Sequence, residues 1–145
     1  MTLQATRIED DDFGGTLPAT TSTAEAEAVD VEQRSMTVRD VLRLLEANRR
    51  LQGTLATNAA LCEATLVQLL GGADPGAVLD GVDVARARLD LAQSMAEFER
   101  ARHQTRGTFI SAQFEHGMNM KEISRRWAIS RQLAHRFFKE ARRDS

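Results

Sequence analysis

The chain of 145 residues is long enough for one modest domain with a tail, or for two small modules. Its composition, 42% hydrophobic and 28% charged, is typical of a soluble globular protein, and no apolar run approaches the roughly 20 residues that span a bilayer. The first residues have no apolar stretch behind a basic start, so we expect no signal peptide and a cytoplasmic location. The single cysteine, Cys62, excludes an intramolecular disulfide and a cysteine-based zinc site.

Charge is distributed unevenly along the chain, although the net charge is only −2. Residues 1–36 carry eight acidic and two basic side chains, whereas residues 105–145 carry four acidic and nine basic ones. Residues 37–104 are close to neutral. An acidic tail combined with a basic end is typical of a protein whose basic end faces nucleic acid.

The acidic segment, residues 1–36, is predicted to be disordered. It combines acids, Gly, Thr and Pro with too few large apolar side chains to offset the entropy of ordering. A weak helix over residues 24–31 is compatible with the composition. We interpret the segment as a solvating tail. The alternative is an acidic arm that competes with DNA for the basic C-terminal face.

Residues 37–104 are predicted to form a helical hairpin that begins with a capped helix. Thr37 and Asp40 have the spacing of a capping box. The apolar residues that follow recur every three or four positions, which indicates one long helix, or two helices bent near Gly53. In either case the helix has a face to bury.

A turn and a second helix complete this hairpin. The sequence GGADPG at 71–76 indicates a turn, and a second helix is expected from about residue 77 to residue 106. Two long helices around a short turn pack most simply as an antiparallel pair. A single hairpin is too thin to bury both faces, so we expect it to dimerise, for example as a four-helix bundle with coiled-coil seams. Asn48 and Asn58 either fix the register of a seam by facing each other or lie at its wet margin.

Residues 105–145 have the pattern of a small trihelical unit. The segment FISAQF at 109–114 has apolar residues at helical spacing. Asn119, with Glu122 three positions later, is predicted to cap a short helix, and Ser130 is predicted to cap the last one. The last two helices are therefore separated by a tight turn.

The segment KEISRRWAISRQLAHRFFKEA resembles the helix-turn-helix motif of resolvases, transposases and region four of sigma factors. The positions that define the motif are occupied here by Ser124, Trp127, Ala128, Ile129, Ser130, Ala134 and Phe137. Ser124 and Ala128 stand where Ala and Gly are more usual, and Trp127 is bulkier than the usual Leu. The resemblance covers roughly a quarter of the chain. It implies a module that places its second helix in the major groove of double-stranded DNA.

The helix expected to begin at Arg131 has one apolar and one basic face. The resemblance implies that its first turns contact base edges, and the residues expected to do so are Arg131, Gln132, His135 and Arg136. A second set is expected to contact phosphates, namely Lys121, Arg125, Arg126, Lys139, Arg142 and Arg143. For Arg142 and Arg143 the alternative is a solvated helix end that is favourable to the helix dipole.

The sequence carries no pattern of catalytic, metal-binding or cofactor-binding residues. His103, His116 and His135 lack metal-ligand spacing with Cys62, and GGADPG lacks the Lys of a phosphate-binding loop. The chain is therefore predicted not to be an enzyme and to use neither a metal nor a cofactor. The predicted fold class is all-α, with a long antiparallel helical hairpin followed by a C-terminal trihelical helix-turn-helix unit.

These features together predict a sequence-specific double-stranded DNA-binding protein that does not associate with membranes. We expect a bacterial or phage transcriptional regulator that forms a homodimer through residues 37–104, with half-sites about one helical turn apart, roughly 34 Å. Two alternatives remain open. One is a recombination accessory or phage DNA-packaging subunit. The other is an adaptor whose hairpin binds a second protein and whose C-terminal module is only structural.

Overall fold

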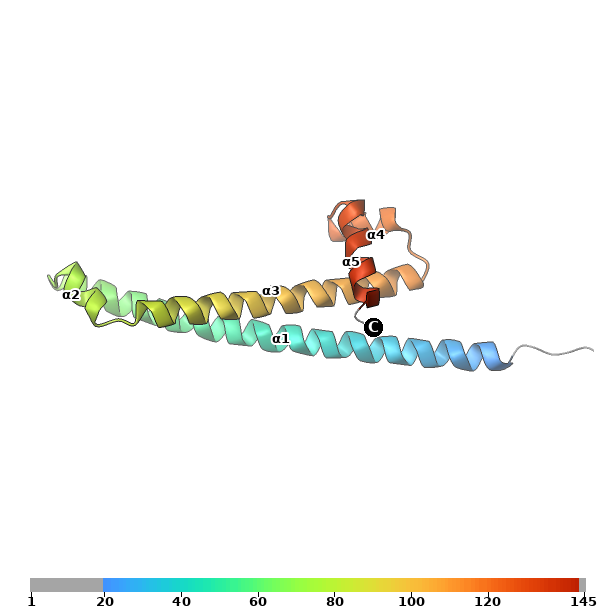
Figure 1. Cartoon of the computed structure of the whole chain (residues 1–145), viewed down its shortest axis with the longest axis horizontal. Helices are drawn as coiled ribbons and strands as arrows, with labels where there is room; N and C mark the ends of the chain where they lie inside the picture. The colour runs from blue at the N-terminus through green and yellow to red at the C-terminus, as the bar shows by residue number, and fades with distance from the viewer. Residues whose placement is uncertain (1–19, 144–145) are drawn as a thin grey trace, which may run out of the picture.

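The computed structural model describes residues 20–143, with side chains from residue 23 onward, and this part of the chain is helical without any strand (Figure 1). The helices are α1 (Thr20–Leu70), α2 (Pro75–Asp80), α3 (Val84–Glu115), α4 (Met120–Trp127) and α5 (Arg131–Arg143). α1 and α3 lie antiparallel, α2 lies at the turn between them, and α4 and α5 stand on α3 near its other end (Figure 1). The predicted all-α class is confirmed. None of the described helices is both long and apolar enough to cross a membrane.

α1 is longer than the sequence predicts. Residues 20–36 form its first turns instead of a disordered tail, and the helix also continues through Gly53 without a break. Thr37 lies inside the helix, where its hydroxyl donates a hydrogen bond to the carbonyl of Gln33 at 2.9 Å, so the cap predicted there is wrong. Ala and Glu in this segment are good helix formers, and packing on a neighbouring helix extends a marginal one. Residues 1–19 lie outside the described residues.

The turn between the long helices contains a short helix that the sequence did not predict. Gly72, with φ of 85°, follows the end of α1. The Asp74 carboxylate accepts a hydrogen bond from the backbone N–H of Ala77 at 3.1 Å and caps α2. The Asp83 carboxylate accepts one from the backbone N–H of Arg86 at 2.9 Å and caps α3. Because of this second cap, the second long helix begins after Asp83 and not near residue 77.

α1 and α3 meet along a narrow seam whose positions are alternately three and four residues apart, the period of a coiled coil. The seam of α1 consists of Gln33, Thr37, Asp40, Leu44, Ala47, Leu51, Thr54, Asn58, Leu61 and Thr65, all partly or fully buried. The seam of α3 consists of Ala87, Leu91, Ser94, Phe98, Ala101 and Thr105. Asn58 is thus in the seam, whereas Asn48 is exposed outside it, so these two asparagines lie on different faces of α1.

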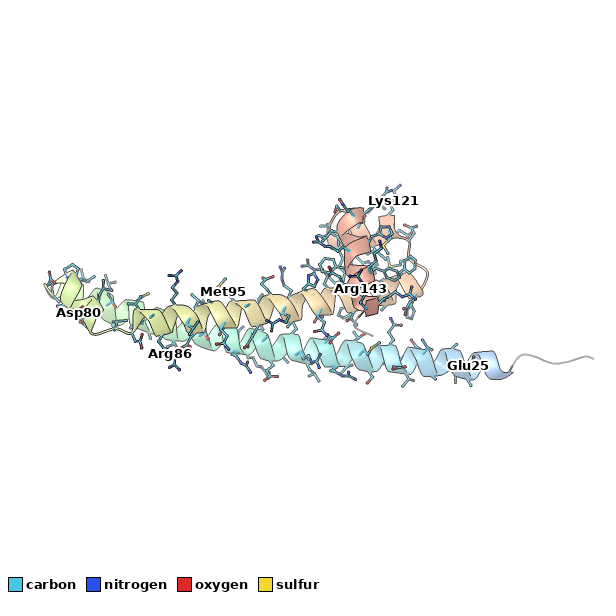
Figure 2. The ribbon with its side chains drawn as sticks, in the orientation of Figure 1. Glu25, Asp80, Arg86, Met95, Lys121 and Arg143 are labelled. Atoms are coloured by element: carbon cyan, nitrogen blue, oxygen red, sulfur yellow. The ribbon has the colours of Figure 1, made fainter. Side chains whose placement is uncertain are left out.

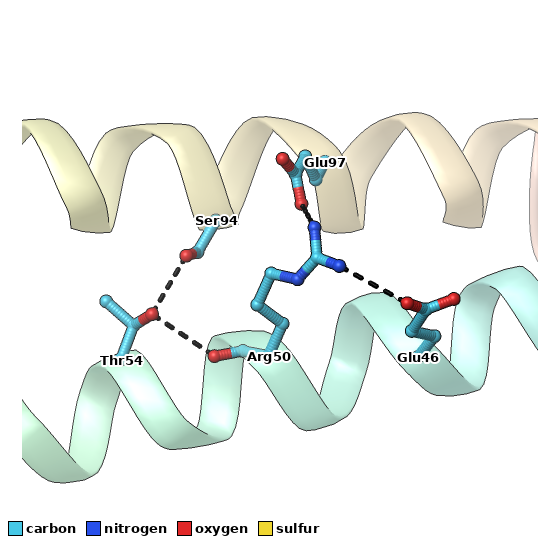
Figure 3. A network of polar contacts seen from close by, with 5 residues as sticks. All are labelled: Glu46, Arg50, Thr54, Ser94 and Glu97. Carbon is cyan, nitrogen blue, oxygen red and sulfur yellow. Dashed lines mark hydrogen bonds and ion pairs between the residues drawn. The ribbon is translucent and has the colours of Figure 1, made fainter.

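Polar contacts cross the middle of the seam (Figure 3). The hydroxyls of Thr54 and Ser94 lie 2.9 Å apart. The Arg50 guanidinium bridges Glu46 on its own helix at 3.2 Å and Glu97 on α3 at 2.6 Å. Exposed ion pairs contribute little to stability. We therefore assign these contacts mainly to the register of the two helices.

Near the C-terminal unit the seam is fixed by a buried carboxylate. Asp40 is only 6% exposed, and its carboxylate accepts a hydrogen bond from the Thr108 hydroxyl at 2.6 Å. Its backbone carbonyl accepts another from the Thr105 hydroxyl at 3.1 Å. Buried polar groups are costly unless they are hydrogen-bonded, so these two threonines specify the position of α3 against α1.

α3 connects the hairpin to the C-terminal unit without a break. The boundary predicted between residues 104 and 105 falls inside this helix, which continues to Glu115. The residues expected to form a separate first helix of the trihelical unit are therefore the last turns of α3. As a consequence, the same rigid element carries both the hairpin seam and the platform for α4 and α5.

Candidate nucleic-acid interface

The last turns of α3 form a hydrophobic core with α4 and α5. Its buried members are Ile110, Met120, Ile123, Ala134 and Phe137. Trp127 packs at the margin of this core, and its indole N–H donates a hydrogen bond to the side-chain carbonyl of Gln113 at 2.8 Å. Trp127, at a position where the resemblance leads one to expect Leu, thus ties α4 to α3 through its polar edge.

α5 crosses α3 closely at Gly107. A Cβ atom at this position would lie 3.4 Å from the carbonyl oxygen of Phe137 and 3.5 Å from the Cβ of Ala141, so a larger side chain would separate the helices. The Phe137 ring lies 4.5 Å from the ring of His103 and 5.3 Å from the Arg106 guanidinium. These contacts hold the C-terminal half of α5 against α3. Sequence reasoning did not identify this crossing, although a lone glycine inside a helical pattern is a signal for close packing.

Both helices of the C-terminal motif have side-chain caps at the positions that the sequence predicts. The Asn119 side chain accepts a hydrogen bond from the backbone N–H of Glu122, and the Glu122 carboxylate accepts one from the backbone N–H of Asn119, both at 3.0 Å. At the start of α5, the Ser130 hydroxyl oxygen accepts a hydrogen bond from the backbone N–H of Leu133 at 3.1 Å. The caps fix where α4 and α5 begin, and thereby which residues occupy the first turn of α5.

The turn between these helices depends on one residue with left-handed backbone geometry. Ala128 ends α4 with φ of 51° and ψ of 43°, and it is the only non-glycine residue with positive φ among the described residues. The left-handed conformation disfavours any residue with a Cβ atom. This explains why glycine is more usual at this position of the motif.

We expect the substitution Ala128→Gly to stabilise the protein by up to about 1 kcal/mol. The left-handed conformation costs alanine roughly 1–2 kcal/mol of stability. Glycine avoids this cost but destabilises the folded state by roughly 0.5–1 kcal/mol, because it has more conformational freedom in the unfolded chain. Thermal denaturation followed by circular dichroism measures the difference. The control is Ala96→Gly, at an exposed position within α3, where the same change should destabilise. An Ala128→Gly protein that melts no higher than wild type would contradict this account of the turn.

The four residues expected to contact bases all lie exposed on the first two turns of α5. They are Arg131, Gln132, His135 and Arg136. Their side chains make no hydrogen bond or ion pair within the described part of the chain. α5 ends beside the hairpin, where Figure 2 labels Arg143, so its first turn points away from the hairpin (Figures 1 and 2).

The six residues expected to contact phosphates are exposed too, on both sides of the turn. The side chains of Lys121, Arg125, Lys139 and Arg143 make no hydrogen bond or ion pair within residues 20–143. Arg126 lies 3.9 Å from the Met118 sulfur. The Arg142 guanidinium lies 5.5 Å from the centre of the Phe138 ring, which gives this residue a packing role inside the unit.

Ion pairing distinguishes the hairpin from the C-terminal unit. Several hairpin arginines pair with carboxylates, namely Arg34, Arg43, Arg50, Arg86 and Arg102. In the described part of α4 and α5, by contrast, no Lys or Arg pairs with a carboxylate. The acids of these helices have other partners, because Glu122 belongs to the cap of α4 and Glu140 bonds to His103 on α3. The cations of α4 and α5 are therefore not neutralised by a carboxylate within residues 20–143.

A groove of about 960 Å³ runs between α1, α3 and the end of α5, and acidic and basic side chains are mixed along its walls. No group of three His, Cys, Asp or Glu side chains suited to a metal ion occurs among residues 20–143. Comparison of the chain with protein-family models, curated proteins and solved structures finds no match.

Proposed function

We propose that the chain is a homodimeric, sequence-specific DNA-binding protein that regulates transcription by placing α5 in the major groove. The observation that carries the proposal is the first two turns of α5, where four exposed polar side chains have no polar partner among the described residues. They lie on a capped helix that rests on its own hydrophobic core and points away from the hairpin. The major groove, about 12 Å wide, admits such a helix.

The proposed contacts divide into those that read sequence and those that supply affinity. Arg131 and Arg136 are suited to two hydrogen bonds with guanine, and Gln132 to two with adenine. The cations that flank this face, on α4 and the later turns of α5, are suited to phosphates, which add affinity without sequence information. The absence of ion pairs from these cations within residues 20–143 supports this division, because no carboxylate of the described chain has to be displaced before a phosphate binds.

The test is a mobility-shift assay on sites first selected from a random oligonucleotide library. Each base contact is worth about 1–3 kcal/mol of discrimination, so Arg131→Ala and Gln132→Ala should each weaken binding to the selected site at least fivefold. Binding to unrelated DNA should change much less. The matched control is Arg86→Ala, which removes an exposed positive charge from the hairpin instead. No shift by wild type at low salt, or an unchanged sequence preference in both variants, would refute the proposed function.

A further inference from the structure

α1 presents a second regular line of residues, which faces solvent. These ten positions, again alternately three and four residues apart, are named here the outer stripe: Val38, Val41, Leu45, Asn48, Gln52, Leu55, Ala59, Cys62, Leu66 and Leu69. All are exposed, and the six large apolar side chains among them are 39% to 55% exposed. The spacing equals that of the seam already occupied by α3, which indicates that a helix is the partner.

The outer stripe lies on one flank of the hairpin. Thr54 and Ser94 face each other in the seam, and each following residue is turned by about 100° around its own helix. Because the helices are antiparallel, Leu55 and Met95 turn to the same flank, and both are exposed. The opposite flank carries the pairs Arg50–Glu97 and Arg86–Asp90. The flank of the outer stripe is thus mainly apolar, with the pair Arg102–Glu99 on its α3 side, whereas the opposite flank is polar and ion-paired.

We propose that the outer stripe binds the outer stripe of a second copy, antiparallel, around a two-fold axis between Gln52 and Leu55. This rests on the homodimer of the proposed function and specifies its face, direction and register. The stripe contains two kinds of position: those followed by another stripe residue three positions later, and those preceded by one three positions earlier. In an antiparallel coiled coil, each position of the first kind packs against a position of the second kind. The two-fold then pairs Val38 with Leu69, Val41 with Leu66, Leu45 with Cys62, Asn48 with Ala59, and Gln52 with Leu55. The large apolar pairs lie at both ends of the contact, and the polar residues lie in its centre.

Charges on α3 agree with the same axis. The α3 residues on the apolar flank include Arg88, Ala92, Met95 and Glu99, each one position after a seam residue. A two-fold between Ala92 and Met95 pairs these two with each other. It also sets Arg88 against Glu99 of the partner, where Glu99 already pairs with Arg102 of its own chain at 2.8 Å. This axis lies beside that of α1, because Thr54 and Ser94 are neighbours in the seam. A parallel dimer would instead place Arg88 against Arg88 and Glu99 against Glu99, which is unfavourable.

The position of the C-terminal unit also favours the antiparallel arrangement. α4 and the first turns of α5 stand on the side of α3 that faces away from α1, whereas the end of α5 reaches the hairpin (Figure 1). The proposed contact lies on a flank. A two-fold axis perpendicular to the helices keeps both C-terminal units on one side of the bundle, where one DNA duplex reaches both. A two-fold along the helices would turn them to opposite sides. Since α5 crosses α3 at Gly107, the two crossings lie about 40 Å apart along the bundle, which predicts half-sites about 12 base pairs apart.

The contact is large enough for a stable dimer. From Val38 to Leu69 the stripe is about 48 Å long. The flank formed by α1 and α3 together is two helices wide, so its area is on the order of 900 Å² on each copy. Stable complexes bury roughly 800 Å² of surface per partner.

Disulfide crosslinking tests both direction and register. Leu45 is exposed, and the proposed register puts it opposite the partner's native Cys62, so Leu45→Cys should form a covalent dimer under mild oxidation that reduction reverses. Wild type should be a dimer by light scattering but should not crosslink, because its two Cys62 residues would lie about 25 Å apart. Glu46→Cys, one position further on and exposed on the ion-paired flank, is the matched control and should not crosslink.

Three results would overturn the proposed interface. They are crosslinking of wild type through Cys62, a monomeric wild type, and a dimeric Leu45→Cys protein that fails to crosslink. Mobility shifts on the same samples separate this proposal from the proposed function. DNA binding by a protein that does not crosslink would reject only the interface, whereas crosslinking without DNA binding would reject only the function.

Discussion

Replacement of Phe137 by alanine is expected to lower the free energy of unfolding of the C-terminal unit by about 3–5 kcal/mol. Phe137 is 3% exposed, and its ring joins the hydrophobic core to the contacts with His103 and Arg106 on α3. A small unit has little stability beyond this amount. We therefore expect α4 and α5 to unfold at room temperature while the hairpin, whose seam lies elsewhere, remains helical and dimeric.

Two spectroscopic signals separate these outcomes. Trp127 is the only tryptophan and lies at the margin of this core, so its fluorescence reports on the C-terminal unit, whereas circular dichroism is dominated by α1 and α3. The control is Phe114→Ala, since Phe114 is 40% exposed and should cost much less. Equal losses from both substitutions, or loss of most helicity in Phe137→Ala, would show that the core does not depend on this ring as inferred.

The features that could be predicted from the sequence are those with local causes. Asn119 and Glu122 are three residues apart, and the Ser130 hydroxyl accepts a hydrogen bond from the backbone N–H of the third residue after it. Both caps can therefore be predicted from short segments of sequence. The inward and outward faces of α5 also follow from local periodicity, and the buried Ala134 and Phe137 lie on the face expected to be apolar.

The features that were missed depend on partners far away in the chain. Asp40 has the spacing of a capping residue, but its side chain and carbonyl bond to Thr108 and Thr105, 68 and 65 residues away. Periodicity predicted a broad apolar face on α1 without showing that it contains two separate lines. Leu44 belongs to the seam with α3, whereas the adjacent Leu45 belongs to the outer stripe, and only packing distinguishes them.

Introducing two acids into the outer stripe, Leu45→Glu with Leu66→Glu, is expected to dissociate the dimer and to weaken binding to a two-half-site DNA by about 10²–10⁴-fold. The proposed two-fold would bring four carboxylates into one apolar contact, where unpaired charge is strongly disfavoured. A monomer has only one recognition helix. It therefore loses the increase in affinity that comes from binding two linked half-sites at once, which is about 10²–10⁴-fold. Affinity for a single half-site should stay unchanged, because the first turns of α5 point away from the hairpin and Leu45 and Leu66 lie on α1.

The matched control is Thr57→Glu with Ala64→Glu, which adds the same charge to exposed positions on the opposite flank of α1. Light scattering should find this variant dimeric and the stripe variant monomeric, and both should keep the helical content of wild type. If both variants lose DNA affinity to the same extent, the cause is added negative charge and not the interface. If the stripe variant becomes monomeric but binds the two-half-site DNA as well as wild type does, dimerisation does not serve DNA recognition. The outer stripe would then have to be explained by a different role of the hairpin.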